Sequence, residues 1–152
     1  MLVSDLKTIV EIMELAGGSF PVVKIAGFNL YATNGIAMAV RGVEFKEEGF
    51  IKKSDLPMLK AILTRDKKEE FTKESLANFI DAECDYFPTT EQVKAAFEQK
   101  FEYEINFNAD ALTKILKAMK SKNNEVIMKI NGNKSPFIIV HENGNGLIQP
   151  IT

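Results

Sequence analysis

Residues 101–151, FEYEINFNADALTKILKAMKSKNNEVIMKINGNKSPFIIVHENGNGLIQPI, decide the fold that we expect for this chain. Aromatic and aliphatic residues alternate with polar ones from Phe101 to Phe107, which is the period-2 pattern of a half-buried strand. Asn108 can cap a helix that follows at once. The apolar residues of this helix recur at helical spacing: Leu112, Ile115, Leu116 and Met119. The segment therefore predicts a strand followed by an amphipathic helix.

Three short strands are expected after this helix, at 125–130, 136–141 and 146–151. Asn131-Gly132 lies between the first two, and the run Asn-Gly-Asn-Gly from 143 to 146 lies before the third. Asn-Gly tolerates the positive φ angles of tight hairpin turns. These turns predict an antiparallel meander and not a set of crossovers.

The first part of the chain repeats this order of a helix and three strands. Ser4 can cap a helix that ends at Gly17-Gly18 and has the apolar stripe Leu6, Ile9, Val10 and Met13. Strands are expected at 21–26, 28–33 and 36–45, joined by Gly27 and by Asn34-Gly35. The pattern predicts one α+β domain over 1–152, built from two helix-plus-antiparallel-strands units.

A partly helical insertion at about 46–100 separates the two units in this prediction. Helices are expected at 54–63, 72–80 and 89–97, and Thr89 with Gln92 forms a capping box at the last of them. The mixed charges at 65–70 are typical of a solvated loop.

The expected helix at 109–120 has a basic face opposite its apolar one. Lys114, Lys117 and Lys120 lie within about 120° of one another on a helical wheel. Two interpretations remain open for these lysines, a solvated helix face or a surface that faces nucleic-acid phosphates.

Several segments together resemble the bacterial DNA sliding clamp, the β subunit of the replicative polymerase. The run EINFNADALTKILKAM, with NEVIMKI, PFIIV and LIQPI after it, is similar to the closing half of a clamp domain. NLYATNGIAMAV at 29–40 resembles the clamp segment ATDGHRLAV, and GFIKKSDLPMLKAIL at 49–63 resembles the strand and helix that follow it. DAECDYFPTTEQV at 81–93 is similar to the clamp element FPDYRRV. The resemblance implies a DNA-clamp-like fold.

The resemblance also implies two binding surfaces. Double-stranded DNA would be contacted without sequence preference by lysines, which are Lys114, Lys117 and Lys120, extended by Lys52, Lys53 and Lys60. Short apolar peptides of replication or repair proteins would enter a groove formed by Thr33, Gly35, Met38, Pro88, Val93, Gln149, Pro150 and Ile151. Without the resemblance, the groove residues read as turn, cap and strand-end positions.

Composition limits the classes of protein that fit. Lys plus Arg total 19 against 21 Asp plus Glu, so the net charge of −2 does not by itself predict nucleic-acid binding. The single cysteine, Cys84, excludes an internal disulfide. No apolar run reaches a membrane span and the N-terminus lacks the apolar core of a signal peptide, so we expect no membrane partner and a cytoplasmic location.

An enzymatic function is not expected. His141, the only histidine, lies at a predicted strand end and is expected at the surface or at a sheet edge. Cys84 has no basic residue near it in sequence and reads as a small buried hydrophobe. Asp81, Glu83 and Asp85 carry oxygen ligands but lack the loop pattern of a cation site, so neither a metal nor another cofactor is predicted.

The resemblance implies a sliding-clamp-like protein, a processivity factor that encircles DNA or docks on it and on replication proteins. Such a protein would form a homo-oligomer, since a clamp ring contains six domains. The alternative is a monomeric or dimeric clamp-fold binding module of a phage or mobile element, which docks clamp-binding peptides or modulates a host clamp. A small hydrolase or metal enzyme is a third class.

Overall fold

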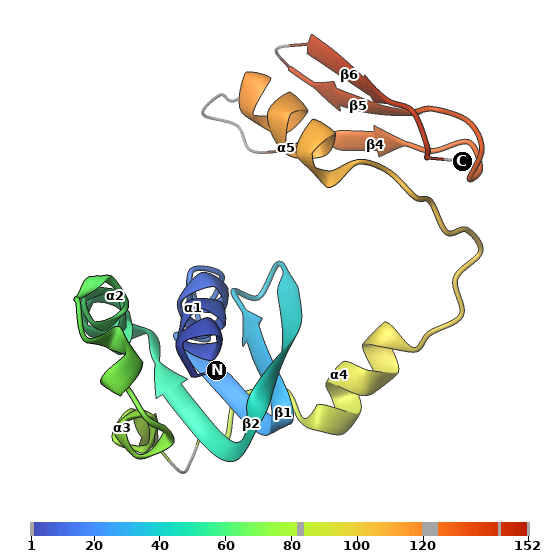
Figure 1. Ribbon diagram of the computed structural model, residues 1–152. Helices are drawn as coiled ribbons and strands as arrows, with labels where there is room; N and C mark the ends of the chain where they lie inside the picture. The colour runs from blue at the N-terminus through green and yellow to red at the C-terminus, as the bar shows by residue number, and fades with distance from the viewer. Residues whose placement is uncertain (1, 82–83, 120–124, 143, 152) are drawn as a thin grey trace. The chain divides into compact units, whose positions relative to one another are not determined.

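The computed structural model describes residues 2–81, 84–119, 125–142 and 144–151 (Figure 1). The chain forms two compact units, Met1–Phe97 and Glu98–Thr152. The first unit combines several helices, and the second the single described helix α5, with a three-stranded antiparallel sheet, so the α+β class is confirmed. Sequence analysis placed 46–100 as an insertion within one domain, whereas the structure divides the chain after Phe97 and includes 46–97 in the first unit.

The first unit contains a sheet with the strand order β1-β2-β3 and four helices. Its elements are α1 (Leu2–Met13), β1 (Val22–Thr33), β2 (Met38–Lys52), the 3₁₀ turns η1 (Lys53–Asp55) and η2 (Lys68–Glu70), α2 (Leu56–Thr64), α3 (Lys73–Ala77), β3 (Ile80–Asp81) and α4 (Thr90–Phe97). The short β3 pairs with the end of β2, at Phe50 and Ile51. The third strand therefore comes after the helices and not before them, which corrects the expected order.

β1 and β2 form one long hairpin. The separate strands expected at 21–26 and 28–33 are a single strand, and the pairing register shifts between Gly27 and Asn29. Gly27 has a φ of 61°, and its N–H donates to the carboxylate of Glu48 at 2.9 Å. Sequence analysis expected Gly27 to join two strands. In the structure it instead forms a bulge-like irregularity within one strand, and its N–H is hydrogen-bonded. The expected turn at Asn34-Gly35 is confirmed, since the side-chain oxygen of Asn34 accepts from the N–H groups of Ile36 and Ala37.

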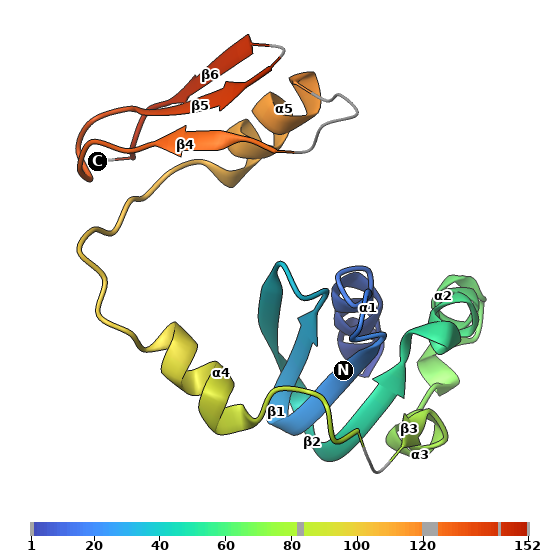
Figure 2. The ribbon, with the colours of Figure 1, turned by 180° about the vertical axis from the view of Figure 1, so that it is seen from behind.

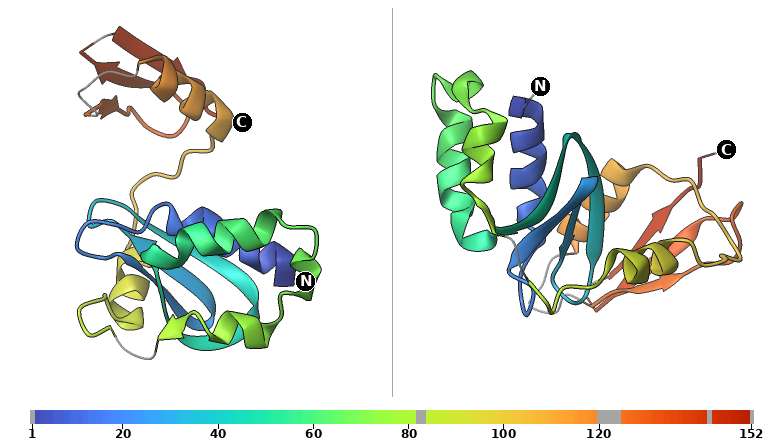
Figure 3. Two further views of the ribbon diagram at one scale, coloured as in Figure 1. Left: turned by 90° about the vertical axis from the view of Figure 1, so that its left-hand side faces the viewer. Right: turned by 90° about the horizontal axis from the view of Figure 1, so that it is seen from below.

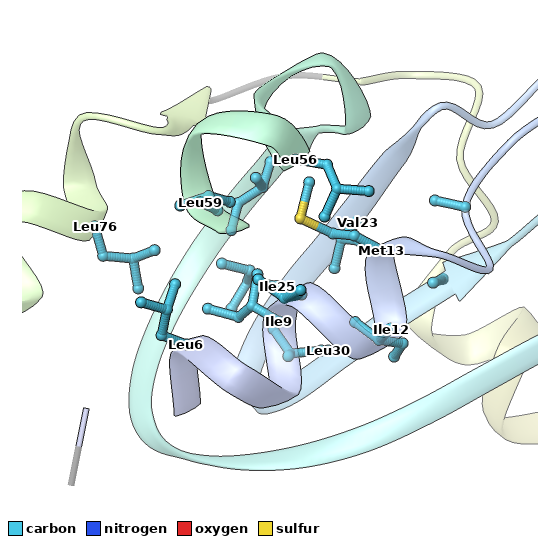
Figure 4. Packing of buried hydrophobic residues seen from close by; sticks show 14 of the residues in the cluster. Leu6, Ile9, Ile12, Met13, Val23, Ile25, Leu30, Leu56, Leu59 and Leu76 are labelled. Carbon is cyan, nitrogen blue, oxygen red and sulfur yellow. The ribbon is translucent and has the colours of Figure 1, made fainter. Parts of the chain in front are cut away.

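One face of this sheet is covered by α1, α2 and α3. The predicted stripe of α1, Leu6, Ile9, Val10 and Met13, is buried in full. Leu6, Ile9 and Met13 cluster with Val23, Ile25 and Leu30 of β1 and with Leu59 of α2 (Figure 4). This cluster is the main core of the unit.

The opposite face is covered by the segment that ends in α4, as the right-hand view of Figure 3 shows. Phe87 packs edge-on against Phe20 and Phe50, at ring-centroid distances of 6.0 and 5.9 Å. Val93 is the buried residue of α4. The capping box predicted from Thr89 and Gln92 is confirmed, because each residue's backbone N–H donates to the other's side chain.

The second unit contains α5 (Ala109–Ala118) and the sheet β4 (Ile127–Lys129), β5 (Phe137–His141) and β6 (Gly144–Ile148), in that order (Figure 2). The strands pair as the predicted antiparallel meander. Asn108 caps α5, since its side-chain oxygen accepts from the N–H of Ala111 at 3.0 Å. Phe137, Ile139 and Ile148 form the core with Met119.

Two local predictions in this unit are wrong. Residues 101–107 are not a strand, because only Ile105 and Phe107 pack against the core, whereas Phe101 and Tyr103 are more than half exposed. Of the four alternating apolar residues, only the last two are therefore partly buried against the core. Leu116 does not pack against the core with the partly buried Leu112 and Ile115, and it is 40% exposed.

Candidate functional site

The three lysines of the first unit that were expected to extend a DNA-binding surface form ion pairs or hydrogen bonds within that unit. Lys52 Nζ lies 2.8 Å from a carboxylate oxygen of Asp81, which raises the pKa of Lys52. Lys60 forms an ion pair with Glu14, and Lys53 donates to the main-chain carbonyl oxygens of Glu14 and Ala16 after α1. The charges of Lys52 and Lys60 are thus compensated by carboxylates, which reduces the positive potential available to phosphates, whereas Lys53 is held by neutral main-chain oxygens.

The lysines of α5 differ from those of the first unit. Lys114 and Lys117 are exposed, and neither forms an ion pair with the residues that the structure describes. Lys120 lies outside the described residues. The cationic face predicted for this helix is therefore present at Lys114 and Lys117.

A groove of about 330 Å³ lies in the first unit between α4 and the β1–β2 hairpin. Tyr31 and Val40 line it from the sheet, and Val93 and Phe97 line it from α4. Thr90 and Lys94 complete the lining. The groove is predominantly apolar, as expected of a site for apolar side chains.

The partly buried Lys24 lies near the Thr90 position of this groove. Its ammonium donates to Thr90 Oγ1 at 3.3 Å and to the carbonyl oxygen of Pro88 at 3.5 Å. Within the described chain, Lys24 has no carboxylate partner. A cation is thus held by neutral oxygens beside an apolar groove.

The structure brings together part of the predicted peptide groove. Met38 packs against the cluster that contains Val93, although the two residues are far apart in sequence. Thr33 is buried and serves the turn instead, since its hydroxyl donates to the carbonyl oxygen of Ala37 at 2.7 Å and accepts from the N–H of Gly35 at 3.0 Å. Gly35 has a φ of 88°, which this turn requires.

The other predicted groove residues have different surroundings. Pro88 supplies the carbonyl oxygen to Lys24. Gln149, Pro150 and Ile151 belong to the second unit, where the N–H of Ile151 donates to the carbonyl oxygen of Asn106 at 2.6 Å. The groove of the first unit is formed without them.

Sequence analysis missed Tyr31, Val40, Phe97 and Lys24. Tyr31 and Val40 lie in the segment NLYATNGIAMAV, which the sequence analysis quoted. Sequence analysis did not assign which of its side chains lie on the face of the sheet that lines the groove. Val93 and Phe97 have the i, i+4 spacing that places both on one side of a helix. The position of Lys24 depends on packing between residues 66 positions apart and has no local signal.

His141, Cys84 and the acidic trio are the remaining candidate residues of the sequence analysis. His141 is buried at the end of the central strand β5, which corrects its expected surface or edge position. Cys84 is partly buried against Phe87 and its neighbours, and a hydrogen bond with Cys84 raises the pKa of Tyr86. Glu83 of the expected acidic trio lies outside the described residues. The described residues hold no cluster of three or more His, Cys, Asp or Glu that could bind a metal.

Comparison of the chain with protein-family models, curated proteins and solved structures finds no match. In the part of the chain that the structure describes, no helix is long and apolar enough to cross a membrane.

Proposed function

We propose that the first unit is a docking module that holds a short apolar segment of a replication or repair protein between α4 and the β1–β2 hairpin. One observation carries this proposal. Met38 and Val93, which the sliding-clamp resemblance assigns to a peptide groove, pack in one apolar cluster, and Val93 also lines the groove. An aromatic or branched side chain of a partner would be buried between Tyr31 and Phe97, as in other hydrophobic anchor sites.

A peptide-docking function suits this unit better than DNA binding. The cations Lys52 and Lys60 form ion pairs, and the unit carries 12 Lys plus Arg against 15 Asp plus Glu. Apolar docking does not require an excess of positive charge. Clamp-like activity would then consist of recruiting proteins through the first unit.

Titration of the full chain with a Gln-Leu-Ala-Leu-Phe peptide, followed by NMR chemical shifts and calorimetry, tests the proposal. We expect shifts at Tyr31, Val93 and Phe97, and Phe97→Ala should weaken binding about tenfold, as loss of an aromatic anchor typically does. Phe28→Ala is the matched control, because Phe28 is 53% exposed and Phe97 is 55% exposed, but Phe28 does not line the groove. Equal effects of the two substitutions, or no shifts at millimolar peptide, would contradict the proposal.

A second candidate function is non-specific DNA binding by α5 in the second unit. It is favoured by Lys114 and Lys117, which are exposed and form no ion pair with another described residue, on a helix whose other side packs on the sheet. Lysines on flexible stems contact phosphates without reading the bases. In a clamp-like protein, the two units would then divide DNA contact and partner docking between them.

A further inference from the structure

β4 is an edge strand with an unusually apolar surface. It pairs with β5 along one side, and no strand of the described chain pairs with its other side. Val126, Ile127, Met128 and Ile130 are between 38% and 61% exposed. An edge of this kind presents unpaired backbone groups to another strand.

The side chains of this segment alternate between two faces. Ile127 pairs with Val140, whereas Met128 pairs with Ile139, which is buried in the core that includes residues of α5. Ile127 therefore lies on the face that points away from α5, and strand alternation places Lys129 on that same face. Glu125 precedes β4 and lines one hollow with Ile127 and Val140, so it lies on this side as well. Both charged residues are exposed.

We propose that β4 is a self-recognition surface that pairs antiparallel with β4 of a second copy of this chain, centred on Ile127. In this register Ile127 lies opposite Ile127 of the other copy. Glu125 lies opposite Lys129, and Lys129 lies opposite Glu125, so opposite charges flank an apolar centre on one face. A register centred on Met128 would place Lys129 opposite Ile127 and would not bring Glu125 and Lys129 opposite each other.

The second copy is the occupant because the edge is complementary to itself. An isologous pair of this kind uses the same patch twice and closes as a dimer. It joins the two sheets into one of six strands, with Ile138, Val140 and Leu147 continuing the apolar face on each side of Ile127. The other edge, β6, is less suitable because Gly144, Asn145 and Gly146 make up most of it.

Sedimentation equilibrium of the full chain over a range of concentrations tests this pairing. The wild type should show a concentration-dependent dimer. Glu125→Lys and Lys129→Glu should each weaken it about tenfold, since either change creates two like-charge pairs across the dimer axis. The double variant Glu125→Lys/Lys129→Glu should restore the dimer, because it exchanges both charges.

Lys134→Glu makes the same change of charge outside β4 and should leave the dimer unchanged. Circular dichroism of every variant separates loss of pairing from loss of folding. If one single variant does not fold, the dimer affinities of the other single variant and of the double variant still test the proposed register. A wild-type monomer at high micromolar concentration, assembly beyond two chains, or a double variant no better than the folded single variants would each overturn the proposal.

Discussion

Asp5 on α1 accepts a hydrogen bond from the backbone N–H of Glu44 on β2 at 3.1 Å, across 39 residues of sequence. Asp5 is 4% exposed, and its partly buried hydrogen bond joins the first helix to the hairpin. Asp5→Ala should lower the free energy of unfolding by about 1–3 kcal/mol, because it removes the charged acceptor of this hydrogen bond. Urea unfolding measures this loss.

Asp5→Asn keeps an acceptor oxygen at the same place and should cost less than Asp5→Ala. If both substitutions have the same small effect, the hydrogen bond does not contribute as described.

Gly49 has no room for a side chain. Its φ is 146°, and a Cβ atom would contact the Ile80 side chain and lie 2.8 Å from the carbonyl oxygen of Asp81 on β3. Gly49→Ala should destabilise the first unit by about 1–3 kcal/mol through this overlap. Gly42→Ala is the control, since nothing lies within 4 Å of its Cβ position, and it should change stability by less than about 0.5 kcal/mol. Thermal unfolding of both variants makes the comparison.

The ion pair of Glu14 with Lys60 predicts that the stability of the first unit depends on pH in the range where Glu14 titrates. The hydrogen bond from Lys60 and its positive charge lower the pKa of Glu14 below the ordinary value of 4.5. This stabilisation is present above that ordinary value and is lost as the pH falls through the lower pKa of the folded state. In Lys60→Met the pKa of Glu14, followed by NMR titration, should rise toward 4.5. An unchanged titration would exclude the pair as its cause.

Lys24 predicts the charge of the segment that occupies the groove. Its partly buried ammonium is held by oxygens of Thr90 and Pro88 and has no carboxylate partner in the described chain. A peptide with a carboxylate beside its apolar residues should bind more tightly than its amidated counterpart, by up to about tenfold, and less so at high salt. Lys24→Met should abolish that difference in calorimetry. A difference that persists in Lys24→Met would place the charge recognition elsewhere.

The two sets of lysines should contribute unequally to DNA binding. Lys114→Gln/Lys117→Gln should reduce the slope of log K against log salt by about 1.8, if both contact phosphates of duplex DNA. Lys52→Gln/Lys60→Gln should change the slope much less, because those cations are paired with Asp81 and Glu14. Fluorescence anisotropy at several salt concentrations measures both slopes. Equal slopes for all variants would contradict the proposal that Lys114 and Lys117 of α5 contact DNA phosphates.

Sequence reasoning succeeded where the signal was local. The stripe of α1, the cap at Asn108, the capping box at Thr89 and the antiparallel order of the last three strands depend on neighbours within a few positions. It failed where distant packing decides the outcome. Gly27 was interpreted as the junction of two strands because a glycine that interrupts an apolar run resembles a turn. In the structure β1 pairs with β2 on both sides of it, and its N–H donates to Glu48.

The same limit applies to the candidate site. Met38 and Val93 could be assigned to one site only through the clamp resemblance, because no local pattern connects residues of β2 and α4. The ion pairs of Lys52 and Lys60 also depend on the fold, so a count of lysines overestimated the free positive charge.

α4 buries Val93, and no other residue of the helix is as well buried. We therefore expect the α4 wall of the groove to open locally at a lower free energy than the sheet that forms the other wall. A ligand that contacts both Val93 and Phe97 would couple its own binding to the order of this helix. Amide hydrogen exchange of 90–97 would then report occupancy of the groove directly, since exchange in α4 slows as the bound fraction increases while exchange in β1 stays constant.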